Sequence, residues 1–202
     1  MSEEKLIVCK RFAGEQHDIR DFVTPNQVEI LGLFQHVKDE YSPLETAAMC
    51  CRYLNRYVQY PANGLGVTID KHRLITFGGA EIFDQPPDPW QFPYETTARV
   101  RWAEKRGRKT FGDCADVTFV LASVLRNQLG SNEVHACIGT YLLDGKKQGH
   151  AWVKMRYNLN IYYCDPTHVF GNPIDFSKYE EYILFNDVDL VIDRDPSNLL
   201  YP

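Results

Sequence analysis

Residues 111–167 constrain the fold more than any other part of the chain, because a helical pattern there is followed by strand-like patterns. Asp113 can cap a helix by accepting hydrogen bonds from its first free N–H groups. The apolar residues after it recur at the spacing of one helical face: Val117, Val120, Leu121, Val124 and Leu125. Gly130 follows, where helices often end on a left-handed residue. The segment therefore predicts a helix with Cys114 in its first turn.

After this helix the sequence alternates with a period of two, which is typical of half-buried strands. We expect strands at 134–143, 150–157 and 161–165, with a turn at 144–149 and a tight turn near Asn158. A helix followed by consecutive hairpin strands predicts the α+β class, with the helix packed on an antiparallel sheet.

The second turn sets the register between the last two of these strands. If Tyr157 and Asn158 are its central residues, His150 lies directly opposite Asp165, and both side chains point to one face of the sheet. A three-residue turn would shift this pairing.

Three residue types in this region have the chemistry of a nucleophilic site. Cys114 lies where free N–H groups and the positive end of the helix dipole favour a thiolate. His150 opens one strand and Asp165 closes another. A thiolate near a histidine that is oriented by a carboxylate is an activated nucleophile for acyl transfer. The alternative is that Cys114 is a small core residue and that Asp165 merely ends a strand.

In this order and spacing, the motifs resemble the transglutaminase-like superfamily of cysteine acyl-transfer enzymes. The matching pieces are GDCAD at 112–116, GHAWV at 149–153, DPT at 165–167, and DPWQFPYET at 88–96, which looks like the segment before the cysteine in bacterial members. The resemblance covers roughly residues 42–170.

The resemblance implies a papain-like α+β core with Cys114 as nucleophile, His150 as base and acid, and Asp165 as the residue that orients the histidine. It further implies an oxyanion-hole side chain upstream, for which we take Trp90, with Gln91 and Gln59 as substitutes. Asp116 is interpreted as a residue that contacts the catalytic residues and not the substrate.

The implied activity is hydrolysis of a peptide bond by a thiol protease, through a thioacyl-enzyme. Two alternatives remain open. A protein-glutamine transglutaminase or deamidase would use the same residues, and a structural or binding module of a larger assembly would keep the fold without catalysis. We expect a protein or peptide substrate and no cofactor.

Composition excludes several other classes of function. The 202 residues, 44% of them hydrophobic, fit a single domain, in which we expect a core at 42–170 with extensions at 1–41 and 171–202. A net charge of −5 argues against a nucleic-acid partner. The sequence has no apolar run of the length of a signal peptide or a membrane span, so we expect a cytoplasmic protein.

The six cysteines are Cys9, Cys50, Cys51, Cys114, Cys137 and Cys164. Without a signal sequence, free thiols are expected rather than disulfides. No C-x-x-C pair occurs, so no structural zinc site, and no metal requirement, is expected.

The remaining elements are predicted from caps and turn residues. We expect a strand at 5–9 and a helix begun by the capping box of Ser42 and Glu45. Between them we expect a helix capped by Thr24, with Pro25 in its first position and one apolar face formed by Val28, Leu31, Phe34 and Val37. Residues 59–93 are expected to be irregular, with one or two short strands at 67–77. A helix at 94–105 leads into a basic run, which is either a solvated face or a cleft rim that prefers acidic substrates. A hairpin is expected at 182–192.

Overall fold

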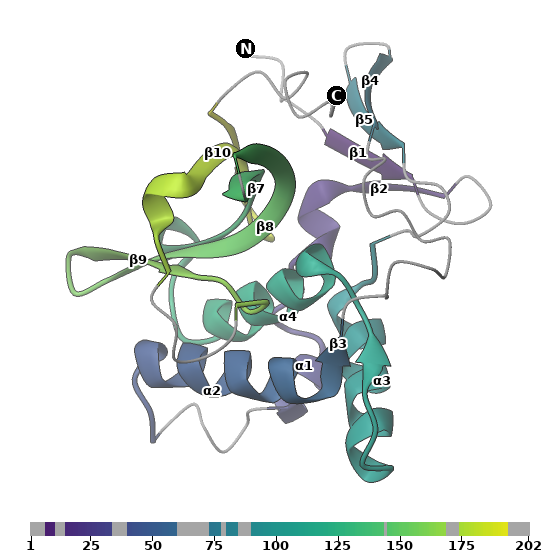
Figure 1. The fold of residues 1–202 in the computed structure, drawn as a ribbon, viewed down its shortest axis with the longest axis vertical. Coiled ribbons are helices and arrows are strands. Elements are labelled where there is room, and N and C mark those ends of the chain that lie inside the picture. Colours follow the sequence, from purple (N-terminus) through teal and green to yellow (C-terminus); the bar gives the residue numbers. More distant parts are fainter. Residues whose placement is uncertain are drawn as a thin grey trace.

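The computed structural model describes residues 7–10, 15–33, 40–59, 73–77, 80–84, 90–143, 145–168 and 174–193. Within these ranges, helices pack on a five-stranded antiparallel sheet, which confirms the predicted α+β class. In Figure 1, helix α4 (Cys114–Arg126) lies between this curved sheet and helix α2 (Pro43–Tyr57).

The five-stranded sheet has the order β11-β10-β7-β8-β9, and all its neighbouring strands are antiparallel. Its strands are β7 (Val134–Leu143), β8 (Lys146–Tyr157), β9 (Asn160–Cys164), β10 (Tyr179–Phe185) and β11 (Leu190–Ile192). The hairpin predicted near the C-terminus is present as β10 and β11. Because β10 pairs with β7, residues beyond 170 complete the same sheet that carries the predicted core.

Helix α4 begins as predicted, at a reciprocal capping box. The Asp113 side chain accepts from the backbone N–H of Asp116 at 3.0 Å, and the Asp116 side chain accepts from the backbone N–H of Asp113 at 3.1 Å. All of its residues from Cys114 to Leu125 are buried, so the whole circumference of α4 belongs to the core. A helix enclosed on every side in this way is positioned rigidly, and so is its N-terminus.

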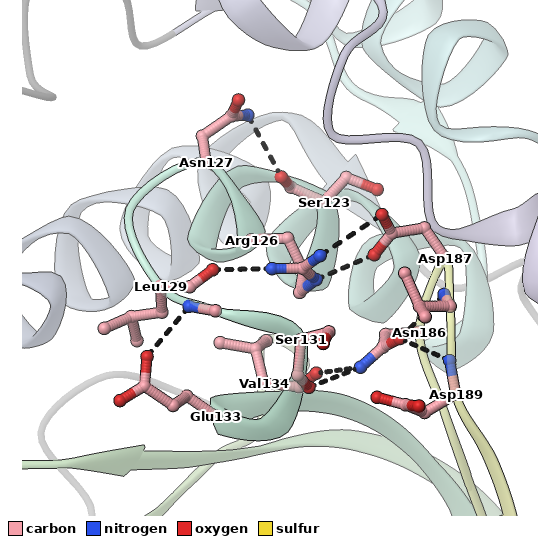
Figure 2. Close-up of polar contacts among 12 residues, drawn as sticks. Ser123, Arg126, Asn127, Leu129, Ser131, Glu133, Val134, Asn186, Asp187 and Asp189 are labelled. Carbon is pink, nitrogen blue, oxygen red and sulfur yellow. Dashed lines mark hydrogen bonds and ion pairs between the residues drawn. The ribbon is translucent and has the colours of Figure 1, made fainter.

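The predicted C-terminus of this helix is wrong. The helix ends at Arg126, and Gly130 has an extended backbone with φ −66° instead of a left-handed one. Polar contacts replace the glycine cap and join the helix end to the β10–β11 hairpin (Figure 2). Arg126 donates to both carboxylate oxygens of Asp187, at 2.7 and 3.2 Å. The fully buried Asn186 donates to the carbonyl groups of Ser131 and Val134.

The two predicted turns of the sheet are shorter or displaced. Strand β8 begins at Lys146 opposite Leu143, so only residues 144–145 separate the strands, and Gly145 supplies the positive φ of 77°. The β8–β9 turn uses Asn158 and Leu159, with φ values of 49° and 65°.

The second displacement changes the predicted register. Val153 pairs with Cys164 and Tyr157 with Asn160, so His150 and Asp165 are diagonal neighbours and not directly opposite each other. The register differs from the prediction by an even step, however. Both residues therefore keep the same face, which is the property on which contact between them depends.

The described N-terminal half of the chain contains a second sheet and further helices. The sheet has the order β2-β1-β5-β4, from strands β1 (Ile7–Lys10), β2 (Gln16–Asp18), β4 (Arg73–Phe77) and β5 (Ala80–Asp84). Strand β4 lies within the range 67–77 in which short strands were expected, whereas β5 lies after it.

Helix α1 (Val28–Leu33) starts later than predicted, because the Thr24 hydroxyl bonds the Gln27 side chain in a turn before the helix. Its predicted buried face is also wrong, since Val28 is 73% exposed and Ile30 is buried instead. Phe34 and Val37, the other members of that face, lie outside the described residues.

Helix α2 confirms its predicted capping box, since Ser42 and Glu45 bond each other reciprocally. Helix α3 (Pro93–Lys105) confirms the helix expected before the basic run. Two short parallel strands, β3 (Val58–Gln59) and β6 (Thr110–Phe111), follow α2 and α3 and lead the chain to the start of α4. No helix in the described part of the chain is long and apolar enough to cross a membrane.

Candidate active site

Cys114 is the first residue of α4, directly after the Asp113 cap, and is 8% exposed. At this position the sulfur lies beside the unsatisfied N–H groups and the positive end of the helix. The segment 110–113, anchored by the β3–β6 pairing, sets where the helix starts. The location of Cys114 is thus fixed both by the buried helix that follows and by the short strand that precedes it.

His150 lies in β8 opposite Gly139 of β7, with 13% of its side chain exposed. Its ring is surrounded by aromatic side chains. Ring centroids lie 5.9 Å away at Tyr141, 6.2 Å at Trp152 and 5.8 Å at Tyr179. This surrounding fixes the plane of the imidazole.

Asp165 follows β9 and is 5% exposed. Its Oδ2 atom lies 2.7 Å from Nε2 of His150 and also accepts from the Tyr179 hydroxyl at 2.8 Å. Its Oδ1 atom accepts from the Thr167 backbone N–H at 2.9 Å and from the Thr167 hydroxyl at 2.6 Å. The carboxylate of this buried residue is therefore held from both sides.

The electrostatics of the histidine and the carboxylate are mutually reinforcing. Burial alone would lower the pKa of His150, but its hydrogen bonds with Asp165 and Cys114 raise it to about 10. Burial alone would raise the pKa of Asp165, but the bonds from His150, Thr167 and Tyr179 lower it to about 2. Near neutral pH the pair consists of an imidazolium and a carboxylate, with the imidazolium beside Cys114.

The structure thus brings Cys114, His150 and Asp165 together, from the start of a helix, from a strand and from the turn after the next strand. Since Nε2 of His150 bonds Asp165, Nδ1 is the ring nitrogen left for Cys114. This is the relation that a nucleophile, a base and an orienting group require.

Trp90 and Gln91 lie behind the start of α4. The Trp90 indole is 2% exposed and packs in T-shaped contacts on Phe22 and Phe119, at 5.7 and 5.3 Å between ring centroids. Gln91 donates from its backbone and its side chain to the two carboxylate oxygens of Asp116, at 2.8 and 2.9 Å. These contacts anchor the 90–91 segment to the nucleophile helix, and the oxyanion role of both residues stays a prediction without a contact that supports it.

Gln59 is the exposed one of the three candidate oxyanion side chains. It ends β3 beside Phe111 and lines a small cavity of about 30 Å³ together with Asp113 and Thr167. This cavity has room for a single water-sized group next to the nucleophile helix.

Three residues that position the site were missed by sequence reasoning. Tyr179 lies beyond the family resemblance, and no local pattern marks it. Thr167 closes the DPT motif, and an Asp-x-Thr sequence is a signal for the side-chain-to-backbone turn that it forms. Asn55 of α2 donates to the carbonyl groups of Pro166 at 2.7 Å and His168 at 3.1 Å, and so ties the Asp165 turn to a helix more than a hundred residues earlier.

The other cysteines differ from Cys114 in their surroundings. All six are free thiols. Burial raises the pKa of each of the remaining five: Cys9, Cys50, Cys51, Cys137 and Cys164. Thiols of this kind behave as small apolar residues.

Helices packed on a five-stranded antiparallel sheet, with a cysteine at a helix N-terminus beside a histidine–carboxylate pair, define a protein of the α+β class. A particular protein of this class has the same fold, namely LapG from Legionella pneumophila. Its calcium-bound structure superposes with a TM-score of 0.53 at 15% identity, covering 81% of this chain and 76% of LapG.

Two further LapG structures agree. For the EGTA-treated form the TM-score is 0.54 at 14% identity, and the match covers 83% of this chain and 76% of LapG. For a third LapG structure the TM-score is 0.53 at 14% identity, and the match covers 84% of this chain and 80% of LapG. No protein-family model and no curated protein sequence matches the chain. At this level of identity the likeness concerns the fold alone.

Among the described residues, no group of three or more His, Cys, Asp or Glu side chains could hold a metal ion.

Proposed function

We propose that the protein is a cysteine-dependent acyl-transfer enzyme that hydrolyses peptide bonds. The observation that carries the proposal is the 2.7 Å bond between Nε2 of His150 and the buried Asp165, which leaves Nδ1 of the histidine for Cys114 at the start of α4. The LapG fold supports the protease assignment within the class.

The first half of the reaction forms a thioester. The Cys114 thiolate attacks the scissile carbonyl carbon, and the carbonyl oxygen becomes an oxyanion that the Cys114 backbone N–H stabilises. We propose Gln59 as a second donor, because it is exposed beside the nucleophile helix whereas Trp90 and Gln91 are engaged in the interior. The His150 imidazolium then gives its Nδ1 proton to the leaving amine as the carbon–nitrogen bond breaks.

The second half releases the acid. Neutral His150 takes a proton from water, the resulting hydroxide attacks the thioester carbon, and the carbon–sulfur bond breaks to regenerate the thiolate and the imidazolium. Asp165 stabilises the imidazolium and keeps Nε2 protonated, so that Nδ1 always faces the sulfur. Every group in these steps comes from the chain, from the substrate or from the attacking water.

The first test is the order in which the six thiols react with limiting iodoacetamide on the folded protein, read by peptide mapping. We expect Cys114 to be labelled first, since the pKa of each of the other five thiols is raised and those thiols stay neutral. Cys137→Ser is a control that should leave this labelling intact. Labelling of Cys9 or Cys50 ahead of Cys114 would contradict the proposal.

Substrate profiling then decides among the activities. Wild-type protein and Cys114→Ala are incubated with a peptide library, and new termini are identified by mass spectrometry. Cleavage that only the wild type performs supports the protease. Ammonia release without cleavage would replace it with a deamidase, and amine incorporation with a transglutaminase. A reactive Cys114 with no turnover of any amide would favour a non-catalytic module.

A further inference from the structure

Tyr179 extends the catalytic arrangement into the C-terminal part of the chain. It is the first residue of β10, and its hydroxyl reaches Oδ2 of Asp165 at 2.8 Å, the same oxygen that bonds His150 at 2.7 Å. It lies outside the segment that resembles the transglutaminase-like family. Its contact with the carboxylate is therefore a property of this fold and not of the motif.

The ring of Tyr179 is held on several sides. Ring centroids lie 4.8 Å away at Tyr141, 5.0 Å at Trp152 and 4.9 Å at Phe176, in addition to the contact with His150. These ring contacts and the bond to Asp165 together hold the hydroxyl toward the carboxylate.

The backbone is built to allow this approach. Strand β10 has a bulge between Glu181 and Ile183, beside Gly139 of β7. A Cβ atom at Gly139 would overlap the Glu180 carbonyl oxygen and lie 2.7 Å from the Trp152 ring. The glycine thus permits the close strand contact that places Tyr179 over the site, and bulges commonly redirect a side chain in this way.

The direction of the hydrogen bond is determined. Burial and the neighbouring Asp165 raise the pKa of Tyr179, so the phenol stays protonated and donates. With the two bonds from Thr167 and the one from His150, all four acceptor positions of the carboxylate are used. A carboxylate with every acceptor position filled cannot rotate away from the imidazole.

We propose that Tyr179 is a positioning residue of the catalytic pair, which fixes the Asp165 carboxylate so that His150 presents Nδ1 to Cys114. This role rests on the proposed function. It predicts that loss of the hydroxyl alone weakens the chemical step while the fold and substrate binding persist.

The test is Tyr179→Phe, with Tyr182→Phe as its matched control. Tyr182 lies on the same strand and is buried, but its hydroxyl approaches Glu180 at 3.4 Å. We expect kcat, or the alkylation rate of Cys114, to fall about 10-fold in Tyr179→Phe with KM nearly unchanged, because a hydrogen bond to a charged acceptor is lost. The control should keep both values.

Two further readouts separate positioning from general damage. In a ¹³C NMR titration the pKa of Asp165 should rise in Tyr179→Phe, since a donor to its charged form is removed, and stay unchanged in Tyr182→Phe. In an Asp165→Ala background, Tyr179→Phe should have no additional effect on Cys114, because it acts through Asp165.

The outcomes are distinguishable. An unreactive Cys114 in the wild-type protein would overturn the proposed function itself. A reactive Cys114 together with a Tyr179→Phe variant that matches the wild type in rate and in the Asp165 titration would overturn the role of Tyr179 alone.

Discussion

Asp165→Asn is a sharp test of the site, because four donors converge on one carboxylate. An amide keeps the shape but has a single acceptor oxygen. If that oxygen faces Thr167, the NH₂ group faces Nε2 of His150. The ring must then carry its proton on Nδ1, where it can no longer accept one from Cys114. If the oxygen faces His150, the NH₂ group meets the N–H and hydroxyl of Thr167 instead.

The size of the effect follows from these contacts. By analogy with serine triads, the wrong tautomer lowers kcat by roughly 10²–10⁴, equivalent to about 2.7–5.4 kcal/mol in the barrier. A buried donor left facing another donor costs about 1–3 kcal/mol of folding free energy. For a chain of this size each kcal/mol lowers the thermal midpoint by about 2–4 °C.

The pH dependence gives a second signature. In the wild type the raised pKa of His150 contributes stability that is complete below its unfolded value and is lost as pH rises through about 10. The lowered pKa of Asp165 contributes stability that is present above its unfolded value and is lost as pH falls through about 2. In Asp165→Asn the negative charge beside His150 is lost, so the pKa of His150 falls. The change in the Cys114 alkylation rate that accompanies deprotonation of His150 should therefore occur at lower pH than in the wild type.

The assay measures kcat/KM, alkylation rate and thermal midpoint for Asp165→Asn beside two matched variants. Asp187→Asn breaks the paired bonds to Arg126 at the far end of α4, so it should lower stability while activity persists. Asp175→Asn changes an exposed residue that bonds Ser177 and should alter neither. An Asp165→Asn enzyme with a wild-type midpoint and near-normal turnover would remove Asp165 from the mechanism, and the DPT match would then be coincidence.

Two further results are expected. Treatment with EDTA or EGTA should leave Cys114 alkylation and peptide cleavage unchanged, because the chain itself supplies the nucleophile, base and oxyanion donor; activity that is lost and then restored by calcium or zinc would refute this. Gly139→Ala should lower the free energy of unfolding by about 1–3 kcal/mol in denaturant titrations, since its Cβ meets the Glu180 backbone. Gly130→Ala is its control, because there the added Cβ meets only the flexible end of Glu133. Equal stability of the two variants would show that the β7–β10 contact is not tight.

Much of the local structure could be predicted, because it depends on neighbours in sequence. The capping boxes at Ser42 and Asp113 connect residues three positions apart, and both helices begin where predicted. The same applies to the apolar face of α4 and to the alternation of β7 and β8. The α+β class follows from the order of these elements.

Elements that depend on distant partners were predicted less well. A glycine such as Gly130 often follows the last turn of a helix, but here contacts between Arg126 and Asp187 fix the helix end four residues earlier. Thr24 and Pro25 resemble a helix start, yet the side chain of Gln27 engages Thr24, and the helix begins at Val28. The buried face of α1 could not be deduced from the spacing of its apolar residues, because the segments packed around the helix decide which of its faces is shielded from solvent.

Local sequence was enough to predict that Cys114 starts a helix and that His150 and Asp165 share one face of the sheet. Both follow from capping and from the two-residue period of strands, which act over a few residues. Long-range packing sets the β8–β9 register, the anchoring of the Trp90–Gln91 segment by Asp116, and the contacts of Tyr179 and Asn55 with the Asp165 turn. Those contacts join segments tens of residues apart, and no local pattern encodes them, because they exist only once the sheet has closed around α4.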